Sequence, residues 1–233
     1  MSCINLDMFR PLSSWINRKY PIPARFYTPG YVDVPKDDWS VWLSIEEAAP
    51  LHLAPSMNWL SLKESREITE SYLKNASEII NGLEGGWLDG EERAWILDAL
   101  GEPPLPSLPI YLITCSDGES EELVYVGKTK NSSRFSGGHI AALKLHAPEY
   151  AKKEKKIYRS TVWFHNDDEY ISFDWIKPES LAHKLLDSVE SQLIYRFQPV
   201  LNIDKKKKSY TKWNFHIHIQ NFLGGAFLND TFI

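Results

Sequence analysis

The chain has 233 residues, of which 43% are hydrophobic and 24% charged, with a formal net charge of −5. This is an ordinary globular composition, long enough for one large domain or two small ones. Two cysteines are too few for a disulfide framework or a thiolate metal site. No apolar run reaches the roughly 18 residues of a membrane span and the N-terminus lacks a signal pattern, so we expect a cytoplasmic protein without a membrane partner.

The charge is unevenly distributed along the chain. Residues 1–107 contain 9 Lys and Arg against 16 Asp and Glu, whereas residues 124–160 contain 9 against 2. A basic stretch favours contact with nucleic acid, although lysine runs also serve as solvated surface. The candidate nucleic-acid contacts are Lys130, Lys152, Lys153, Lys155 and Lys156.

The first part of the chain predicts a mainly helical domain. An irregular start is predicted by Pro21, Pro23, Pro29 and Pro35, and the pattern turns helical from Ser40 to Leu100. Within it we expect one helix after Ser61 and a second that begins at Asp89 and ends at Gly101. The proline-rich residues 101–109 mark a boundary, which gives an N-terminal accessory or recognition domain at residues 1–104.

The second domain, residues 105–233, predicts a small antiparallel sheet flanked by helices, so the fold class is α+β. A hairpin comes first, and a helix from Pro178 to just before Pro199 places Leu185, Val189 and Leu193 on one stripe. The expected elements are strands at 110–115 and 123–126, helices at 136–145 and 148–156, strands at 157–165 and 170–176, the long helix, and a strand at 213–219.

The stretch from Val124 to His139 is a candidate phosphate site. A short strand leads into a basic, Gly- and Ser-rich turn that carries Lys128, Arg134 and His139. Fixed cations of this kind stabilise the charge on a phosphoryl oxygen. The Gly-Lys-Thr at residues 127–129 is not a P-loop, because Glu122 stands where the earlier glycine is needed. The alternative is an ordinary solvated turn.

Glu190 borders the apolar stripe of the long helix. A carboxylate at the edge of the core is costly unless it is paired or bound to a metal, and the alternative is an exposed glutamate. His216 and His218 share one face of a predicted strand, but without a third ligand they do not predict a zinc site.

Several of these motifs, taken in order, resemble the GIY-YIG nuclease superfamily over about residues 109–203, in its restriction-endonuclease-like branch. They are Ile110-Tyr111, Tyr125-Val-Gly127-Lys-Thr, Arg134, Glu190 on a helix, and Pro199-Val-Leu-Asn202. Pro109 takes the place of the family's first glycine, and Val126 that of its isoleucine.

The resemblance implies a catalytic set. Tyr111 and Tyr125 match the two family tyrosines, Gly127 the glycine, Arg134 the catalytic arginine, and Glu190 the metal-binding glutamate. Asn202 matches the asparagine after the helix, and Lys128 and His139 stand where the restriction-enzyme branch has a lysine and, in some members, a histidine.

This set suits hydrolysis of a phosphodiester. Glu190 would hold Mg²⁺ or Mn²⁺, which needs only one or two carboxylates besides water and substrate phosphate. Arg134 would grip a non-bridging oxygen through its planar guanidinium. A tyrosine, with help from Lys128, or His139 would activate the water, and the sequence does not separate them.

The resemblance therefore implies a Mg²⁺-dependent DNA endonuclease with a role in restriction or defence against phage. RNA stays open as the substrate. The alternative is a catalytically silent nucleic-acid-binding or protein-interaction subunit of a larger complex. The acidic N-terminal domain motivates that alternative, because it would repel DNA and could instead bind a second copy or another protein.

Overall fold

The structure is a computed structural model that describes residues 10–22, 39–82, 86–129, 143–165, 170–207 and 213–233. Its helices are α1 (Ser13–Ile16), α3 (Leu62–Ile79), α4 (Gly90–Leu100) and α6 (Glu179–Phe197), and its 3₁₀-helices are η2 (Leu51–Ser56), η5 (Pro148–Tyr150) and η6 (Phe173–Trp175). Its strands are β1 (Ser40–Pro50), β2 (Ile110–Ser116), β3 (Glu121–Lys128), β4 (Glu154–His165), β5 (Tyr170–Ser172), β6 (His216–Asn221) and β7 (Thr231–Phe232).

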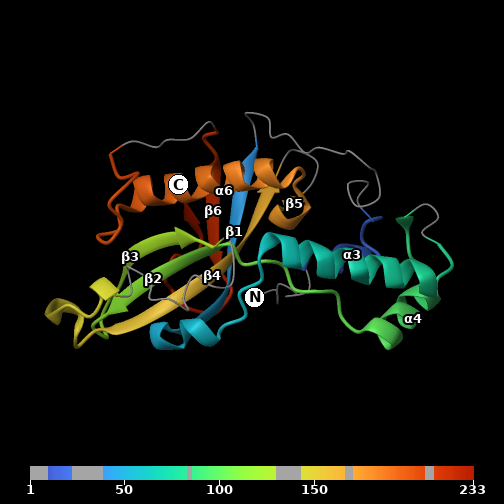
Figure 1. Cartoon of the computed structure of the whole chain (residues 1–233), viewed down its shortest axis with the longest axis horizontal. Helices are drawn as coiled ribbons and strands as arrows, with labels where there is room; N and C mark the ends of the chain where they lie inside the picture. Colours follow the sequence, from blue (N-terminus) through green and yellow to red (C-terminus); the bar gives the residue numbers. More distant parts are fainter. Residues whose placement is uncertain (1–9, 23–38, 83–85, 130–142, 166–169, 208–212) are drawn as a thin grey trace.

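The strands form one mixed sheet in the order β3-β2-β4-β1-β6-β7, with β5 also paired to β4 (Figure 1). The α+β class is confirmed, but the prediction of a small antiparallel sheet is wrong because the sheet has seven strands and β1 runs parallel to β6. The helical prediction from Ser40 is also wrong at its start. There, Val41, Leu43 and Ile45 alternate along β1 and are buried, as the period of two of a strand requires.

Strand β1 lies in the predicted N-terminal domain but forms part of the sheet of the second domain. It belongs to residues 1–104, yet it pairs with β4 and β6 of residues 105–233. The sheet is therefore built from both parts of the chain. A domain boundary between residues 104 and 105 stays a prediction, and it concerns only the helices that follow β1.

The two faces of the sheet carry separate apolar clusters. Helix α6 covers one face, where its buried Leu185, Val189 and Leu193 pack with Leu43 of β1. The predicted stripe of α6 is confirmed. The opposite face of β2 and β3 is covered by a second cluster that includes Trp59, which follows η2.

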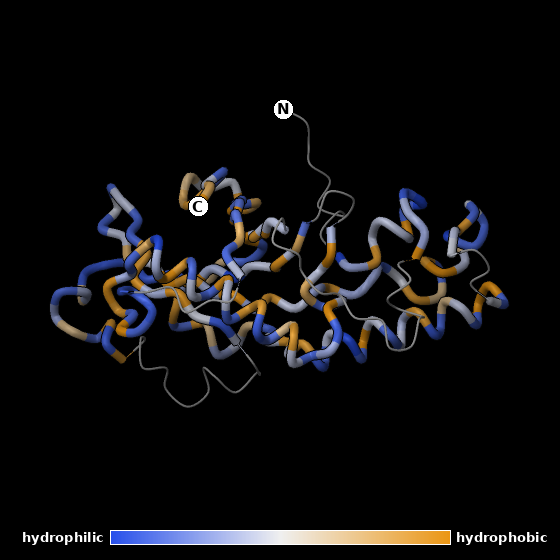
Figure 2. The backbone as a smooth tube through the Cα atoms, turned by 90° about the horizontal axis from the view of Figure 1, so that it is seen from above, coloured by the Kyte–Doolittle hydropathy of each residue, from blue (hydrophilic) through white to orange (hydrophobic). Residues whose placement is uncertain are grey.

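Helices α3 and α4 form a third apolar cluster with α1, beside the sheet (Figures 1 and 2). Both helices begin with a capping box, on Ser61 and Asp89, and α4 ends at Gly101 as predicted. Figure 2 shows an elongated molecule with these helices at one end and the sheet at the other.

Polar contacts around the buried Asp174 fasten α3 to the sheet. Arg66 of α3 donates to the carbonyl oxygens of Asp174, at 2.9 Å, and Ile176. The backbone N–H of Ser107 and the hydroxyl of Ser172 donate to the Asp174 carboxyl group, at 3.3 and 3.2 Å. Burial raises the pKa of Asp174 above its ordinary value, because the carboxylate loses hydration.

Two expectations for residues 143–176 fail. The helix expected at 148–156 is reduced to a single 3₁₀ turn at Pro148–Tyr150, because β4 begins at Glu154. The strand expected at 170–176 stops at Ser172, whose hydroxyl accepts from the N–H of Asp174 and so caps η6. The helix predicted at 136–145 lies mostly outside the described residues.

We expect Asp174→Asn to flatten the pH dependence of stability. Because the folded-state pKa of Asp174 is raised, folding takes up a proton in the window between the two pKa values. The free energy of unfolding therefore falls as pH rises from the ordinary value near 3.9, by about 1.4 kcal/mol per unit of pKa difference. Urea unfolding from pH 4 to 7 measures the slope. The matched control is Asp98→Asn on α4, which is exposed and should follow the wild type.

Candidate functional site

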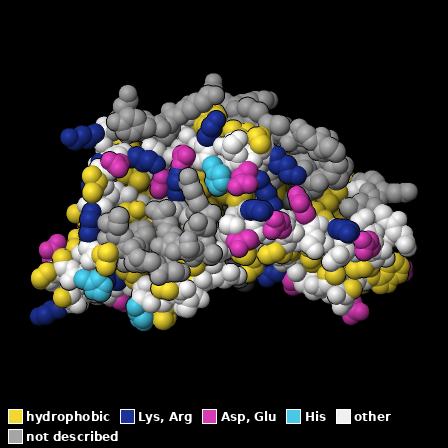
Figure 3. All heavy atoms as spheres, in the orientation of Figure 1, with side chains coloured by type: hydrophobic (Ala, Val, Ile, Leu, Met, Phe, Trp, Pro, Cys, Tyr) yellow, Lys and Arg dark blue, Asp and Glu magenta, His cyan; other side chains and the backbone are white. Residues whose placement is uncertain are grey.

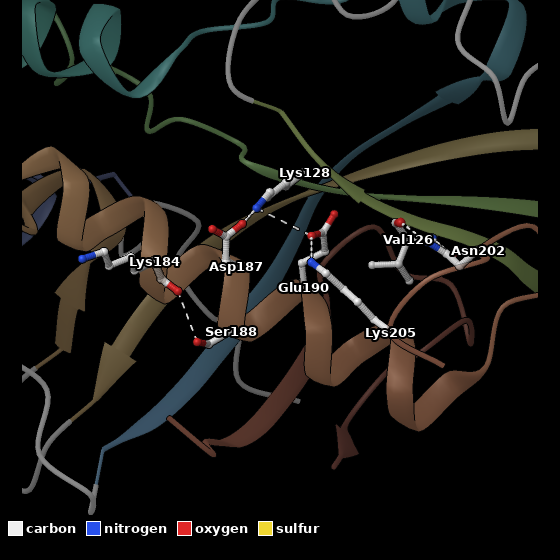
Figure 4. A network of polar contacts seen from close by, with 8 residues as sticks. All are labelled: Val126, Lys128, Lys184, Asp187, Ser188, Glu190, Asn202 and Lys205. Atoms are coloured by element: carbon white, nitrogen blue, oxygen red, sulfur yellow. Dashed lines mark hydrogen bonds and ion pairs between the residues drawn. The ribbon is translucent and has the colours of Figure 1, made fainter. Parts of the chain in front are cut away.

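Two carboxylates and two ammonium groups gather where α6 passes the edge strand β3 (Figure 4). Lys128, the last residue of β3, forms ion pairs with Asp187 and with Glu190, the latter at 3.7 Å from Nζ to Oε2. Lys205 donates to the same Oε2 of Glu190 at 2.5 Å. We call Lys128, Asp187, Glu190 and Lys205 the edge cluster.

Local geometry explains why these four side chains meet. Asp187 and Glu190 are three residues apart on α6 and therefore lie on one face of the helix. Lys128 and Val126 alternate with Tyr125 and Gly127 along β3, so Lys128 points to the face that α6 covers. Gln198 ends α6 in a left-handed conformation, and the loop after it brings Lys205, also with a positive φ of 68°, back over Glu190.

The two lysines of the edge cluster balance the negative charge of the buried Glu190. The side chains of Glu190 and Lys128 are only 11% and 12% exposed, whereas that of Asp187 is 50% exposed. A carboxylate at this depth needs a counter-charge, and two lysines supply it. The prediction that Glu190 borders the core is confirmed. Basic and acidic side chains also alternate over the surface that carries α6 and α3 (Figure 3).

Asn202 fixes the loop after α6 to the edge strand. Its side-chain oxygen accepts from the Val126 N–H and its amide nitrogen donates to the Val126 carbonyl, both at 2.9 Å. The N–H of Leu201 donates to the Val124 carbonyl at 2.9 Å. The loop thus pairs with β3 much as a further strand would.

Tyr111 and Tyr125 lie together on the face opposite α6. Tyr111 is fully buried and its ring stacks on that of Tyr125, with the centroids 6.0 Å apart. Gly127 pairs with Tyr111 across the two strands, and a Cβ there would stand 2.4 Å from the Tyr111 Cζ and hydroxyl oxygen. Glycine at this position is therefore required by the ring of Tyr111.

The structure divides the predicted site residues into two groups. Lys128 and Glu190 meet on the α6 face, and the two tyrosines meet on the other face. Asn202 lies at the edge that joins the faces, because β3 is the outermost strand. Arg134, His139 and Lys130 lie outside the described residues.

The lysines of residues 152–156 do not join the edge cluster. Across β2, the position on β4 that is level with Lys128 is Ser160, because both residues lie opposite Ile110. Lys156 lies opposite Thr114 instead. Lys156 is therefore four residues, or roughly 13 Å, along β4 from the position level with Lys128. Lys155 donates to the Tyr150 carbonyl at 2.7 Å and Lys156 pairs with Glu154 at 3.5 Å.

Sequence reasoning missed Asp187 and Lys205. The i, i+3 spacing of Asp187 and Glu190 on a predicted helix was a usable signal for the first. Lys205 gave none, because it lies in a run of four similar lysines and reaches Glu190 only through the turn after α6.

Asp187 and Glu190 are the side chains of the edge cluster that could hold a hard divalent cation, and in the structure both are paired with lysine. Asp187 and Glu190 offer two carboxylates on one helix face, which matches the one or two carboxylates that Mg²⁺ uses beside water and phosphate. Within the described ranges, no three His, Cys, Asp or Glu side chains are grouped to form a metal site. His218 instead contacts Asp230 at 2.8 Å and stacks on Phe232.

Comparison with models of protein families, with curated proteins and with solved structures found no match. None of the helices in the described part of the chain is both long and apolar enough to cross a membrane.

We expect Gly127→Ala to lower the free energy of unfolding by about 1–3 kcal/mol, because the new methyl group forces the Tyr111 and Tyr125 rings apart. Denaturant titration measures the change. Gly225→Ala is the matched control, since its Cβ would come no closer than 3.8 Å to Asn221. Equal effects of the two substitutions would contradict the packing role of Gly127.

We expect Asn202→Ala to cost about 2 kcal/mol or more, because it leaves the Val126 N–H and carbonyl without their partner. Asn202→Asp should be similarly harmful, since a carboxylate oxygen then faces the Val126 carbonyl. The exposed Asn75→Ala on α3 serves as control and should be close to neutral. A neutral Asn202→Ala would show that the loop does not stabilise β3.

Proposed function

We propose that the chain is a Mg²⁺-dependent endonuclease of the GIY-YIG type that hydrolyses phosphodiester bonds in DNA. The observation that carries the proposal is the edge cluster, in which Lys128 and Glu190 meet although they are 62 positions apart in the sequence. The cluster stands at the end of β3, directly before the basic segment of residues 129–142. That segment contributes Arg134 and His139 to the proposed site by sequence.

Asp187 and Glu190 would hold the metal ion, and Lys128 and Lys205 would move from the carboxylates to the substrate phosphate. When bound, Mg²⁺ supplies Lewis-acid stabilisation of charge on the phosphate. The two lysines are suited to this exchange because an ammonium group is a compact donor on a flexible stem. Arg134 would hold a non-bridging oxygen through its planar guanidinium.

We assign different roles to the two tyrosines. Tyr111 is fully buried, stacks on Tyr125, and contacts the Trp59 ring edge-on at 6.0 Å. A phenol in that position acts through packing. Tyr125 is only partly buried and is the outer of the pair, but it lies on the face opposite Glu190, so we assign the attacking water to His139 by sequence and keep Tyr125 as the competing candidate.

A second candidate function is a nucleic-acid-binding or protein-interaction subunit without turnover. The observation that favours it is the same pairing of Glu190 with two lysines, since a carboxylate already neutralised gains less from a metal ion. The exposed rings of Trp87 and Trp95 near α4 offer a surface for a protein partner or a second copy. A role in restriction or phage defence is proposed by analogy with the family alone.

We expect Glu190→Gln to lower the rate of DNA cleavage by roughly 10²-fold or more, because it removes the buried metal ligand. Supercoiled plasmid, linear duplex, single-stranded DNA and RNA would be incubated with Mg²⁺ or with EDTA. Asp187→Asn should have a smaller effect, since Asp187 is half exposed. Glu67→Gln, at an exposed i,i+4 ion pair on α3, is the matched control.

The folding of each variant would be checked by thermal unfolding. Full activity of a folded Glu190→Gln protein would contradict the metal assignment. Binding of DNA without cleavage of any substrate by the wild type would instead support the non-catalytic subunit.

A further inference from the structure

A pocket of about 240 Å³ lies on the sheet face opposite α6, where β1 begins and β4 ends. The edge cluster lies on the other face and shares no residue with it. The volume is below the roughly 300–1,000 Å³ of pockets for drug-sized ligands, so the pocket suits a smaller group. Its walls come from four strands and include the side chains of Ser40, Trp42, His165, Tyr170, His218 and Gln220.

The strand registers bring these side chains together. Along β1, buried core residues alternate with Ser40 and Trp42, which therefore point to the face opposite α6. His165 of β4 lies opposite both Ser40 and Tyr170, and His218 of β6 lies opposite Trp42. The pocket is therefore built on paired strands, which fix the positions of its walls.

Two aromatic rings of the pocket meet at an angle. The ring centroids of Trp42 and Tyr170 lie 5.7 Å apart, and the ring planes are inclined at 59°. Tyr170 is 49% exposed, and Trp42 is partly exposed. Because neither ring lies flat on the other, ring surface remains accessible to a planar ligand.

Polar groups without a permanent charge surround these rings. Gln220 supplies an amide and Ser40 a hydroxyl, and two histidines supply ring nitrogens, so the pocket offers both donors and acceptors. One of the histidines, His218, is held in place by the contact of its Nε2 with Asp230 Oδ1 at 2.8 Å. Among the described residues, no Asp, Glu, Lys or Arg lines the pocket. This lining favours a ligand group without a formal charge.

The lining matches a planar group with an aromatic face and hydrogen-bonding atoms on its edge. A purely apolar ring would leave the amide and the histidine nitrogens without partners, and a sugar ring has no π-face to stack on tyrosine and tryptophan. A nucleobase has both features. In a duplex its edge is paired and its faces are stacked, so only an unpaired base can enter such a pocket.

We propose that this pocket binds a single unpaired nucleobase, which stacks on Tyr170 and Trp42 and forms hydrogen bonds with Gln220 and His218. The base belongs to a single strand or to a free nucleoside, because both present the same chemistry. The proposal goes beyond the nuclease function and does not depend on it, since the pocket needs neither a metal ion nor the edge cluster.

Fluorescence anisotropy of the full chain in EDTA, which prevents metal-dependent cleavage, tests the proposal. The probes are a short, labelled, single-stranded adenine oligonucleotide and the same strand with every base replaced by an abasic site, so that the phosphates are identical. We expect the strand with bases to bind at least about tenfold more tightly, because only it can stack on the rings. Equal affinities, or no binding of the strand with bases at about 100 μM protein, would overturn the proposal.

Unlabelled adenosine distinguishes the two sources of the base. Competition by adenosine for the strand with bases would show that a free nucleoside fills the pocket. Base-dependent binding of the strand without such competition would assign the pocket to a base within a strand.

Tyr170, the first residue of β5, gives a matched pair of variants that should both fold, because its side chain is half exposed. Tyr170→Phe keeps the ring, and Tyr170→Leu replaces it with an aliphatic side chain. We expect Tyr170→Leu to bind the strand with bases about fivefold or more weakly than Tyr170→Phe, with no difference for the abasic strand. Tyr20→Leu, at an exposed tyrosine that follows α1, is the control and should match the wild type. Identical affinities of the two Tyr170 variants would place the base outside this pocket.

Discussion

The candidate site depends on how the chain closes the exposed edge of strand β3. An edge strand presents backbone donors and acceptors that need partners. The side chain of Asn202 and the N–H of Leu201 supply them, and both belong to the loop that follows α6. The end of α6 is thereby fixed beside β3. Because side chains alternate along the strand, Lys128 then faces Glu190 instead of pointing away from it.

A second constraint is the position of β1 between β4 and β6. The residues before α3 and α4 complete the sheet, so the helical unit is an excursion of the chain between β1 and β2. Such an excursion needs an attachment of its own. The contacts of Arg66 and Ser107 with Asp174 provide it, and they join three segments at the boundary of the helical unit and the sheet.

Local patterns predicted the elements that are determined locally. The helix after Ser61, the helix that begins at Asp89, the β2–β3 hairpin and the apolar stripe of α6 all follow from periodicity and turn chemistry. Strand β1 was missed because a short alternating run was included in a longer helical interpretation. The pairing of Lys205 with Glu190 and of Arg159 with Trp59 depends on backbone turns and strand registers that no local pattern encodes.

The residues that carry the family resemblance lie on the two faces of β3, and packing explains those on one face better than those on the other. Gly127 and Tyr111 form one packing unit, because the glycine makes room for the ring, and this unit explains both residues without any ligand. Lys128 and Lys205 supply the counter-charge of the buried Glu190, but two ion pairs largely hidden from water are a poor way to stabilise a fold, so packing does not explain why Glu190 is there. We therefore place the proposed chemistry at the edge cluster, and the buried Tyr111 belongs to the scaffold beside it.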